Sequence, residues 1–397
     1  MASNDTQPEL AVAIIGTGFM AAVHVEALRR VGLGVTVRGI LGSTPEKSAA
    51  AARRLGLARA YRSLDELLAD RDVAAVHVNS PNVFHLQQAS AAIRAGKHVL
   101  CEKPLAMTAA ETRELVSLAH AHRGRLVCGV NYNNRFYPLV HEARERVRSG
   151  AVGRLYHING SVAQEWLSRP TDYNWRVLAE QGGTLRALSD IGSHWLDLVQ
   201  FITGRHVTAV CAHYVTVHPQ RIRPEGEVET FSNRAAAGTP VPITTDDYGA
   251  VLLKFDGGLV GSFWVSQVSP GRKYSVRFEL AGERETLAWD SEDPERMWVG
   301  RRPTPDDPPT ATSGLLRRDP GQLYPAAARV SDYPGGHAEG YPDSFKQCFR
   351  SFYRYIRTGD FSTAPDFATF DDGHRDVVMV DAFVESRRRG GWVEVGR

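Results

Sequence analysis

The chain has 397 residues, of which 43% are hydrophobic and 23% are charged, and its formal net charge is +2. This length suits about two domains with substantial cores. The charges are interspersed, and no apolar stretch is long enough to cross a bilayer, so neither nucleic acid nor a membrane is an expected partner. The N-terminal residues lack the features of a secretory signal, which predicts a cytoplasmic location.

The cysteines and histidines do not form a recognisable metal or disulfide pattern. Cys101, Cys128, Cys211 and Cys348 are scattered without Cys-x-x-Cys spacing, so we expect reduced thiols. The 14 histidines include no His-x-x-x-His signature. We therefore expect no metal site.

The first predicted element is an almost unbroken apolar run over 10–15, which is typical of a parallel strand buried on both faces. It leads into a Gly-x-Gly-x-x-Ala pattern formed by Gly16, Gly18 and Ala21. Gly16 allows a tight turn, and Gly18 lets the backbone approach phosphates. The helix that follows would point its free N–H groups at a pyrophosphate, so this segment predicts a dinucleotide site.

Apolar strands then alternate with Ala- and Leu-rich helical segments, which predicts a Rossmann-type, doubly wound parallel sheet over residues 1–131. Ligands of such sheets bind beyond the carboxyl ends of the strands. The predicted strands are 35–41, 73–78, 98–101 and 125–130, the helices are 44–54, 85–95 and 109–123, and the strand ends carry Gly16, Ser43, Ser80, Lys103 and Asn131.

After residue 150 the pattern changes to long strands with alternating apolar residues. This predicts an α+β domain over 132–397, built on a large, mostly antiparallel open sheet, whose last helices can pack back on the first domain. The expected strands are 155–164, 207–217, 247–255, 259–268, 274–280 and 286–289, and the expected helices are 192–203, 341–358 and 372–388.

Two further expectations concern the surface of this second domain. Helices on one face of a sheet leave the other face in need of a partner, so we expect a homodimer or homotetramer joined sheet to sheet. Segment 301–336 is rich in Pro, Asp, Arg and Gly, and we expect it to be a long surface loop.

Five motifs occur in a characteristic order. They are Gly16-Thr17-Gly18-Phe19-Met20, Ser80-Pro81-Asn82-x-x-His85, Ala95-Gly96-Lys97-His98-Val99, Glu102-Lys103-Pro104 and Asp190-Ile191-Gly192-Ser193-His194. Together they resemble the Gfo/Idh/MocA oxidoreductases, the family of glucose-fructose oxidoreductase and inositol dehydrogenase, and the likeness covers nearly the whole chain. It implies NAD or NADP as cofactor and Lys103, Asp190 and His194 as the catalytic group.

The chemistry of these three residues agrees with that role. Oxidation of a secondary alcohol requires removal of the hydroxyl proton, which suits a histidine such as His194. Lys103 would hydrogen-bond the reacting oxygen, and Asp190 would accept from a neighbouring hydroxyl. Which of Lys103 and His194 takes the proton stays open. The structural alternative is a core histidine at His194 and a helix cap at Asp190.

The resemblance also implies the cofactor contacts. No Asp or Glu lies between Glu26 and Glu46, where a carboxylate would bind the ribose hydroxyls of NAD, so NAD and NADP both stay open. Lys47 could pair with the 2′-phosphate of NADP. The expected cofactor-binding residues are Gly16, Thr17, Gly18, Phe19, Met20, Ser43, Thr44, Lys47, Ser80, Pro81, Asn82, His85, Glu102, Lys103, Asn131 and Arg176.

The expected substrate is a sugar, glycoside or cyclitol, because flat apolar side chains mixed with hydrogen-bonding groups suit a neutral polyhydroxylated ring. Two other functions stay open: a redox-neutral enzyme that cleaves or epimerises a sugar through a transient keto form, and a non-catalytic dinucleotide or sugar sensor. Structural roles are the alternative for the aromatic residues. The expected substrate-binding residues are Lys103, Tyr132, Asn133, Arg135, Trp166, Trp175, Asp190, His194 and His337.

Overall fold

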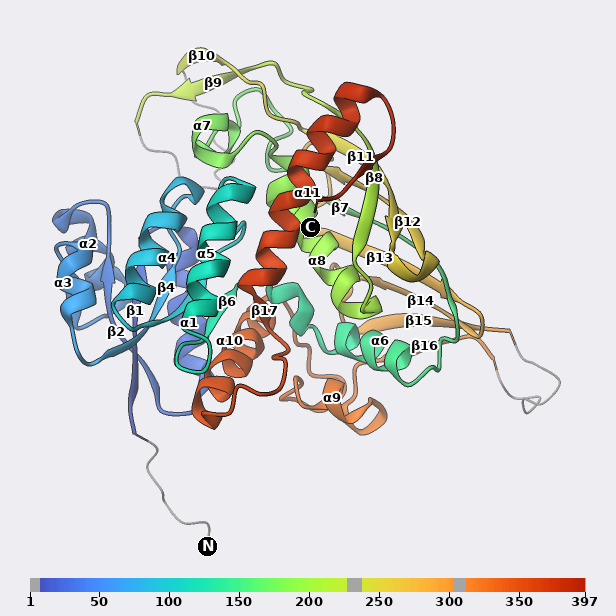
Figure 1. The fold of residues 1–397 in the computed structure, drawn as a ribbon, viewed down its shortest axis with the longest axis horizontal. Helices are drawn as coiled ribbons and strands as arrows, with labels where there is room; N and C mark the ends of the chain where they lie inside the picture. The colour runs from blue at the N-terminus through green and yellow to red at the C-terminus, as the bar shows by residue number, and fades with distance from the viewer. Residues whose placement is uncertain (1–7, 227–237, 303–311, 397) are drawn as a thin grey trace, which may run out of the picture. The chain divides into compact units, whose positions relative to one another are not determined.

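The computed structural model describes residues 8–226, 238–302 and 312–396, and Figure 1 labels its elements. Its contacts divide the chain into two compact units. The first unit runs to Asn133 and also takes Pro342–Val377, whereas the second holds Asn134–Tyr341 and the chain from Val378 onward. Each unit has its own sheet and its own hydrophobic core.

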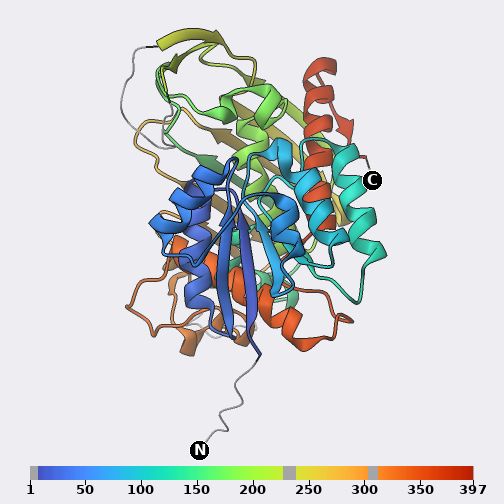
Figure 2. The same cartoon turned by 90° about the vertical axis from the view of Figure 1, so that its left-hand side faces the viewer.

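The first unit contains the predicted doubly wound sheet, with strand order β17-β6-β5-β4-β1-β2-β3. Every pair is parallel except the antiparallel pair of β17 with β6. Figure 2 shows helices on both faces of this sheet. The strands are β1 (Leu10–Ile15), β2 (Val35–Leu41), β3 (Arg59–Tyr61), β4 (Val73–Val78), β5 (His98–Cys101), β6 (Cys128–Val130) and β17 (Ala368–Thr369).

Two helices of the first unit, α2 and α5, begin at threonines whose side chains cap them. The Thr44 hydroxyl accepts the N–H of Lys47, and the Thr108 hydroxyl accepts the N–H of Glu111. The short elements α3 and β3 were not expected, because three to six residues carry too little periodicity to be seen in sequence. The helices are α1 (Phe19–Val31), α2 (Pro45–Leu55), α3 (Leu64–Ala69), α4 (His85–Arg94), α5 (Ala109–Ala121), α10 (Tyr341–Thr358) and the first part of α11 (Phe370–Arg389).

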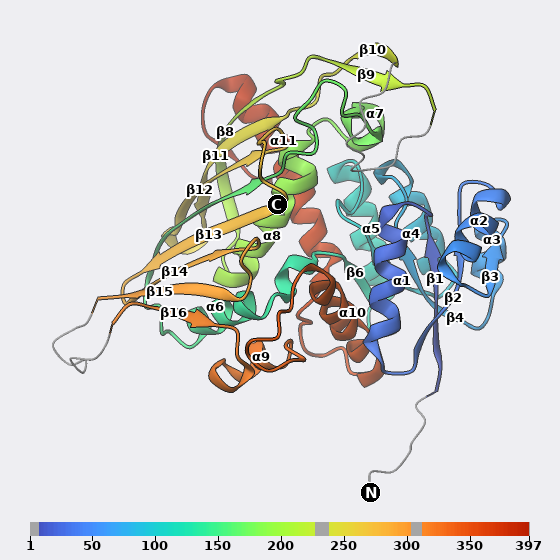
Figure 3. The same cartoon turned by 180° about the vertical axis from the view of Figure 1, so that it is seen from behind.

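The second unit contains the predicted open sheet, which has nine strands in the order β16-β15-β14-β13-β7-β12-β11-β8-β18 and can be followed in Figure 3. Its pairs are antiparallel except β12 with β7. The strands are β7 (Leu155–Ala163), β8 (Val207–Val215), β11 (Tyr248–Phe255), β12 (Val260–Ser266), β13 (Ser275–Gly282), β14 (Glu285–Asp290), β15 (Arg296–Arg301), β16 (Gly314–Arg317) and β18 (Val393–Glu394).

Helices cover one face of this nine-stranded sheet. Side chains from α6 (Pro138–Arg148), α8 (Gly192–Thr203) and the last part of α11 join the buried cluster that the inward residues of the strands form. A separate pair of strands, β9 (Gln220–Pro224) and β10 (Gly238–Pro242), lies outside the large sheet.

The expected long surface loop over 301–336 was wrong in part. Residues 303–311 lie outside the described residues, but the rest contains β16 and α9 (Pro325–Ala328). Leu315 of β16 stands opposite Trp298 of β15. The four-residue strand β16 forms by pairing with β15. A segment rich in turn-forming residues gives no sign of such pairing in its sequence.

Two sequence expectations about the whole chain have outcomes in the structure. All four cysteines are free thiols, as expected. Within the described ranges, no helix is both long and apolar enough to span a membrane.

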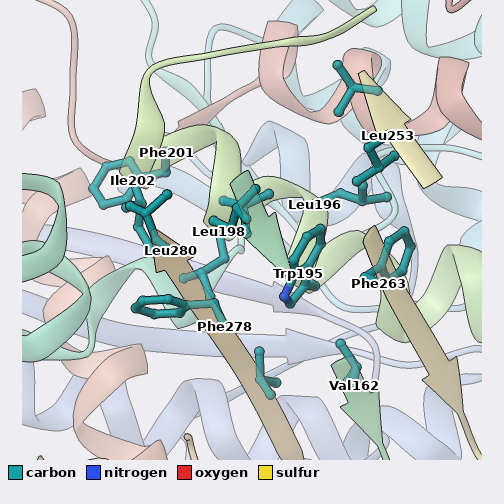
Figure 4. Close-up of a cluster of buried hydrophobic side chains, with 14 of the residues drawn as sticks. Val162, Trp195, Leu196, Leu198, Phe201, Ile202, Leu253, Phe263, Phe278 and Leu280 are labelled. Carbon is teal, nitrogen blue, oxygen red and sulfur yellow. The ribbon is translucent and has the colours of Figure 1, made fainter. Parts of the chain in front are cut away.

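The core of the second unit is built around Trp195 of α8 (Figure 4). The indole stacks on Phe263 with ring centroids 4.9 Å apart, and its N–H donates to the carbonyl of Arg277 at 2.7 Å. A Cβ on Gly160 of β7 would lie 2.1 Å from both the Trp195 Nε1 and the Arg277 oxygen. The indole therefore reaches the sheet only because residue 160 has no side chain.

We predict that Gly160→Ala lowers the free energy of unfolding by about 2–4 kcal/mol, because overpacking displaces the indole and breaks its hydrogen bond. Urea denaturation measures the change. Gly314→Ala is the control, since a Cβ on that strand glycine meets nothing within 4 Å and should change stability little. Equal stability of the two variants would contradict this account of the core.

Candidate active site

Five strand ends of the first unit meet at one edge of its sheet. Ile15 pairs with Leu41 and Val78, Val78 with Cys101, and Cys101 with Val130. The residues that follow continue the ladder, because the N–H groups of Gly16, Asn79, Glu102 and Asn131 donate to neighbouring strand-end carbonyls at 2.7–2.9 Å. The predicted ligand-binding edge thus brings together the segments that begin at Gly16, Gly42, Asn79, Glu102 and Asn131.

The glycine turn has the shape that a bound pyrophosphate requires. Gly16 has φ +108°, and a Cβ there would lie 2.6 Å from the Asn79 carbonyl oxygen. Gly18 starts α1 without a side-chain cap, and no acidic residue stands in the first turn. A Cβ on Gly18 would meet nothing within 4 Å, so the helix N-terminus faces open space. These residues fit a dinucleotide, since an anion there would receive unsatisfied N–H groups and the positive helix end.

The end of β2 carries hydroxyls and cations. Ser43, Thr44 and Lys47 are exposed, and Thr44 also caps α2. The guanidinium of Arg54 donates to the Thr17 carbonyl at 2.8 Å, which links the end of α2 to the glycine turn. Arg54 was not among the expected cofactor residues, because a basic residue in the last turn of a helix looks like an ordinary terminal charge.

His85 joins two loops at this edge. Its Nδ1 lies 2.9 Å from the Pro104 carbonyl oxygen, and its Nε2 lies 2.9 Å from that of Ser80. Burial lowers the pKa of His85, whose side chain is fully buried. The expected direct contact of His85 with a cofactor does not fit this burial, because both ring nitrogens already face protein carbonyls. Its role is to hold the Ser80 and Pro104 loops together.

Glu102 also lies beneath the edge instead of facing a ligand. It is 7% exposed, and its Oε1 accepts from His24 Nε2 at 2.9 Å and from Asn131 Nδ2 at 2.6 Å. Its Oε2 accepts the backbone N–H of Lys103 at 3.2 Å. Burial raises the pKa of Glu102, but the hydrogen bond and charge interaction with His24, the charge of Lys103 and the hydrogen bond from Asn131 lower it to about 2. Glu102 and Asn131 therefore bond to each other below the edge and do not make the expected cofactor contacts. Glu102 is a structural anion beneath Lys103, and Lys103 itself is half-buried.

The catalytic candidates of the second unit lie at an irregular helix start. Asp190 belongs to a π-helical turn, Ala187–Ile191, that continues directly into α8, where His194 stands. Asp246 fixes this turn, because its buried carboxylate accepts the N–H groups of Arg186 and Leu188. Such π-helical turns are frequent at functional sites.

Asp190 faces a cation on an aromatic platform. The Arg176 Nε lies 3.7 Å from Asp190 Oδ2, and the same guanidinium lies 4.5 Å from the Trp175 ring centre and 5.9 Å from that of Trp166. The Nε2 of Gln267 donates to the same carboxylate at 3.3 Å. The second unit therefore brings together four of the predicted site residues: Trp166, Trp175, Arg176 and Asp190.

Three residues of this region, Tyr274, Asn134 and Gln267, were not among the expected site residues. Tyr274 stands edge-on to His194 with ring centroids 6.1 Å apart, and its hydroxyl accepts from Asn134 Nδ2 at 2.7 Å. Burial raises the pKa of Tyr274 well above its usual value, so the hydroxyl stays protonated. Gln267 is the third. A lone amide or tyrosine near a strand end carries no motif, so only the fold could reveal them.

Of four further predicted substrate contacts, three are buried and one is exposed. Tyr132 and Asn133 are buried, and Asn133 donates to the Ser344 hydroxyl at 2.8 Å. Arg135 is buried in a two-bond ion pair with Asp197, because a buried guanidinium needs a carboxylate partner. His337 lies on an exposed segment. The backbone carbonyl of His337 accepts a hydrogen bond from the guanidinium of buried Arg318. In the described parts of the chain, no three His, Cys, Asp or Glu residues gather as metal ligands.

Family models match both units. Residues 10–132 match the oxidoreductase family with an NAD-binding Rossmann fold, and residues 140–288 match the GFO/IDH/MocA C-terminal domain.

Individual proteins match over most of their length. Levoglucosan dehydrogenase of Pseudarthrobacter phenanthrenivorans is 29% identical over 97% of this chain and 98% of its own. An uncharacterised oxidoreductase of Synechocystis is 30% identical over 72% of each chain. A solved levoglucosan dehydrogenase in complex with NADH and levoglucosan superposes with a TM-score of 0.86 at 27% identity, covering 98% of this chain and 100% of that one.

We predict that Gly18→Val leaves the thermal unfolding midpoint nearly unchanged but weakens NADH binding at least about tenfold, because the new side chain occupies only the space that the pyrophosphate needs. Fluorescence titration with NADH measures the affinity. Gly391→Val is the control, because its Cβ also meets nothing within 4 Å but lies in the second unit. Unaltered affinity in Gly18→Val would show that the dinucleotide does not approach this turn.

Proposed function

This chain belongs to the GFO/IDH/MocA oxidoreductase family, and from that premise we propose that it transfers a hydride between a nicotinamide dinucleotide and a secondary hydroxyl or ketone of a sugar, glycoside or cyclitol. One observation carries the proposal. Lys103 follows β5, at the same sheet edge as the Gly16 to Gly18 turn. An ammonium group therefore stands among the strand ends where this fold binds its dinucleotide.

The chain's own residues would bind the reactants and handle the proton. When bound, the dinucleotide supplies the hydride acceptor or donor. The Nζ of Lys103 would hydrogen-bond the reacting oxygen and stabilise its negative charge. His194 Nε2 would take the hydroxyl proton as general base, and Asp190 would orient the substrate by accepting from a neighbouring hydroxyl.

We propose that the dinucleotide is held by the exposed edge of the first unit. The glycine turn would receive the pyrophosphate, and the hydroxyls of Ser43 and Thr44 would meet the adenosine ribose. Lys47 and Arg54 place positive charge at the same end, which is compatible with a 2′-phosphate, so NAD and NADP are tested side by side. The residues of this proposed site are Gly16, Thr17, Gly18, Phe19, Met20, Ser43, Thr44, Lys47, Ser80, Pro81 and Asn82.

Charge compensation in the second unit supports a neutral substrate. The two arginines among the predicted site residues are Arg135 and Arg176, and each faces an aspartate. An anionic substrate would have to compete with Asp197 or Asp190 for these cations. Trp166 and Trp175 are half-buried and offer flat apolar faces, which suit the C–H face of a sugar ring. The relative solved with NADH and levoglucosan supports the same substrate class.

The test is a dehydrogenase screen with sugars, anhydrosugars, glycosides, inositols and their keto forms, each with NAD and NADP. We expect net reduction or oxidation of the dinucleotide with a neutral polyol or its ketone. A sugar product without net change in the dinucleotide would instead indicate a redox-neutral cycle. Activity confined to carboxylate or phosphate substrates would contradict the proposal.

We predict that Lys103→Ala and His194→Ala each lower turnover by at least about a hundredfold on the substrate that the screen identifies, because both groups act on the transition state. NADH binding should stay nearly unchanged. Steady-state rates and NADH titration decide this, with Lys273→Ala and His120→Ala as controls at exposed positions. Near-native turnover in either catalytic-site variant would remove that residue from the catalytic group.

We further propose that the chain forms a homodimer or homotetramer through the open face of the nine-stranded sheet. Large apolar side chains remain exposed on this face, and a depression of about 1040 Å³ runs over its strands. Exposed apolar surface of this extent marks an interaction site. A second copy suits it, because a face repeated on both partners can pair with itself about a two-fold axis. The exposed residues are Leu252, Val260, Trp264, Trp298 and Leu315.

We predict that Trp264→Arg shifts the protein toward monomers, since a guanidinium at the centre of an apolar contact is costly to desolvate. Sedimentation equilibrium measures the mass, which is 43.7 kDa for one chain. Val217→Arg is the control, because Val217 is 48% exposed but lies outside the depression. A monomeric wild-type protein, or an unaltered oligomer in Trp264→Arg, would contradict this interface.

A further inference from the structure

We propose that Tyr353, His77 and His24 form a one-way chain of neutral hydrogen-bond donors that holds the Glu102 carboxylate, and that Glu102 in turn positions Lys103. They are positioning residues. The inference rests on the proposed function for the role of Lys103, but the chain itself is defined by contacts within the first unit.

The chain consists of three buried contacts. The Tyr353 hydroxyl of α10 lies 2.7 Å from His77 Nε2 on β4. His77 Nδ1 lies 2.8 Å from His24 Nδ1 on α1, and His24 Nε2 lies 2.9 Å from Glu102 Oε1. Tyr353, His77 and His24 are each 0% exposed. A residue 276 positions along the sequence from His77 is thus connected to the strand end that bears Lys103.

The Glu102 end fixes the first proton. Both carboxyl oxygens accept hydrogen bonds, Oε1 from Asn131 Nδ2 and Oε2 from the backbone N–H of Lys103, so the carboxylate acts as an acceptor. His24 Nε2, which lies 2.9 Å from Oε1, must therefore carry a hydrogen. Two donors thus converge on Oε1. The open question is whether His24 Nδ1 carries a second proton.

The Tyr353 end answers that question. If His24 carried two protons, it would donate to His77 Nδ1, and neutral His77 would then donate from Nε2 to Tyr353. The Tyr353 hydroxyl has no other hydrogen-bond partner among the described residues, so its own proton would be buried without an acceptor. Native proteins avoid such buried donors without an acceptor, because the lost hydration is not replaced. Tyr353 therefore donates to His77 Nε2.

The remaining protons follow from this direction. Burial lowers the pKa of His77 well below its usual value, so His77 is neutral and carries its one proton on Nδ1. That proton is donated to His24 Nδ1, which leaves His24 neutral with its proton on Nε2. All three hydrogen bonds point toward Glu102, and the carboxylate is the charged member of the chain.

The chain ends inside the protein and does not conduct protons to solvent. Tyr353 is fully buried, with its ring 5.9 Å from His77 in a stacked arrangement and edge-on to Phe352. Its role is therefore to fix geometry. Glu102 in turn restrains the backbone of Lys103, because its Oε2 accepts the backbone N–H of that residue. A displaced catalytic group lowers turnover even where binding is unchanged.

The experiment uses the full-length protein labelled with ¹⁵N. Histidine side-chain spectra of the wild type should show His24 protonated on Nε2 alone and His77 on Nδ1 alone. Tyr353→Phe removes the hydroxyl that keeps His77 Nε2 unprotonated. In that variant we expect hydrogen exchange of the Lys103 amide to become at least about tenfold faster, as the loss of one fixed hydrogen-bond network allows. Turnover should fall with the NADH dissociation constant unchanged.

Tyr355→Phe is the matched control, since it removes a hydroxyl from the same helix that donates to the Thr363 carbonyl instead. A doubly protonated His24 in the wild type would overturn the direction of the chain. Equal Lys103 exchange in the two variants would overturn the positioning role. Both readouts work without substrate, so a failed substrate screen would reject the proposed function and leave this inference decided on its own evidence.

Discussion

Parallel strand pairing is the constraint on which the first unit depends. It places the carboxyl ends of β1, β2, β4, β5 and β6 at one edge, and the ladder continues into Gly16, Asn79, Glu102 and Asn131 by backbone hydrogen bonds. The position of Lys103 relative to the glycine turn is therefore set by backbone geometry. The backbone fixes the arrangement of this edge, and the side chains there supply the chemical groups.

The second unit positions its site residues in another way. Its sheet is mostly antiparallel and offers no common edge of strand ends, so Asp190 is placed by a π-helical turn that buried charges hold. Asp246 binds the backbone of that turn, while Asp247 lies between the guanidinium groups of Arg186 and Arg221. Charges buried in this manner are costly to break because each partner would be left uncompensated.

The two units thus hold their functional carboxylates with different partners. In the second unit arginines compensate Asp190, Asp197 and Asp247, so these anions are neutralised. In the first unit the Glu102 carboxylate accepts hydrogen bonds from His24, Asn131 and the backbone N–H of Lys103 and has no arginine partner among the described contacts. These bonds hold the carboxylate next to Lys103.

The sequence by itself determined the elements with strong periodicity and the residues tied to strand ends. The runs 10–15, 35–41 and 73–78 match their strands residue for residue, and the central run 10–15 is apolar at every position because it is buried on both faces of the sheet. Tertiary structure alone decided which polar side chains are buried against the protein. His85, Glu102 and Arg135 lie in motifs or aromatic-rich segments that resemble a site, yet each is buried, Glu102 and Arg135 against partners 78 and 62 residues away in the chain. Tyr353, Tyr274 and Gln267 carry no local pattern, and their roles arise only from contacts across dozens to hundreds of residues. Periodicity reports burial of backbone segments, whereas hydrogen-bond partners depend on long-range packing that a single sequence does not encode locally.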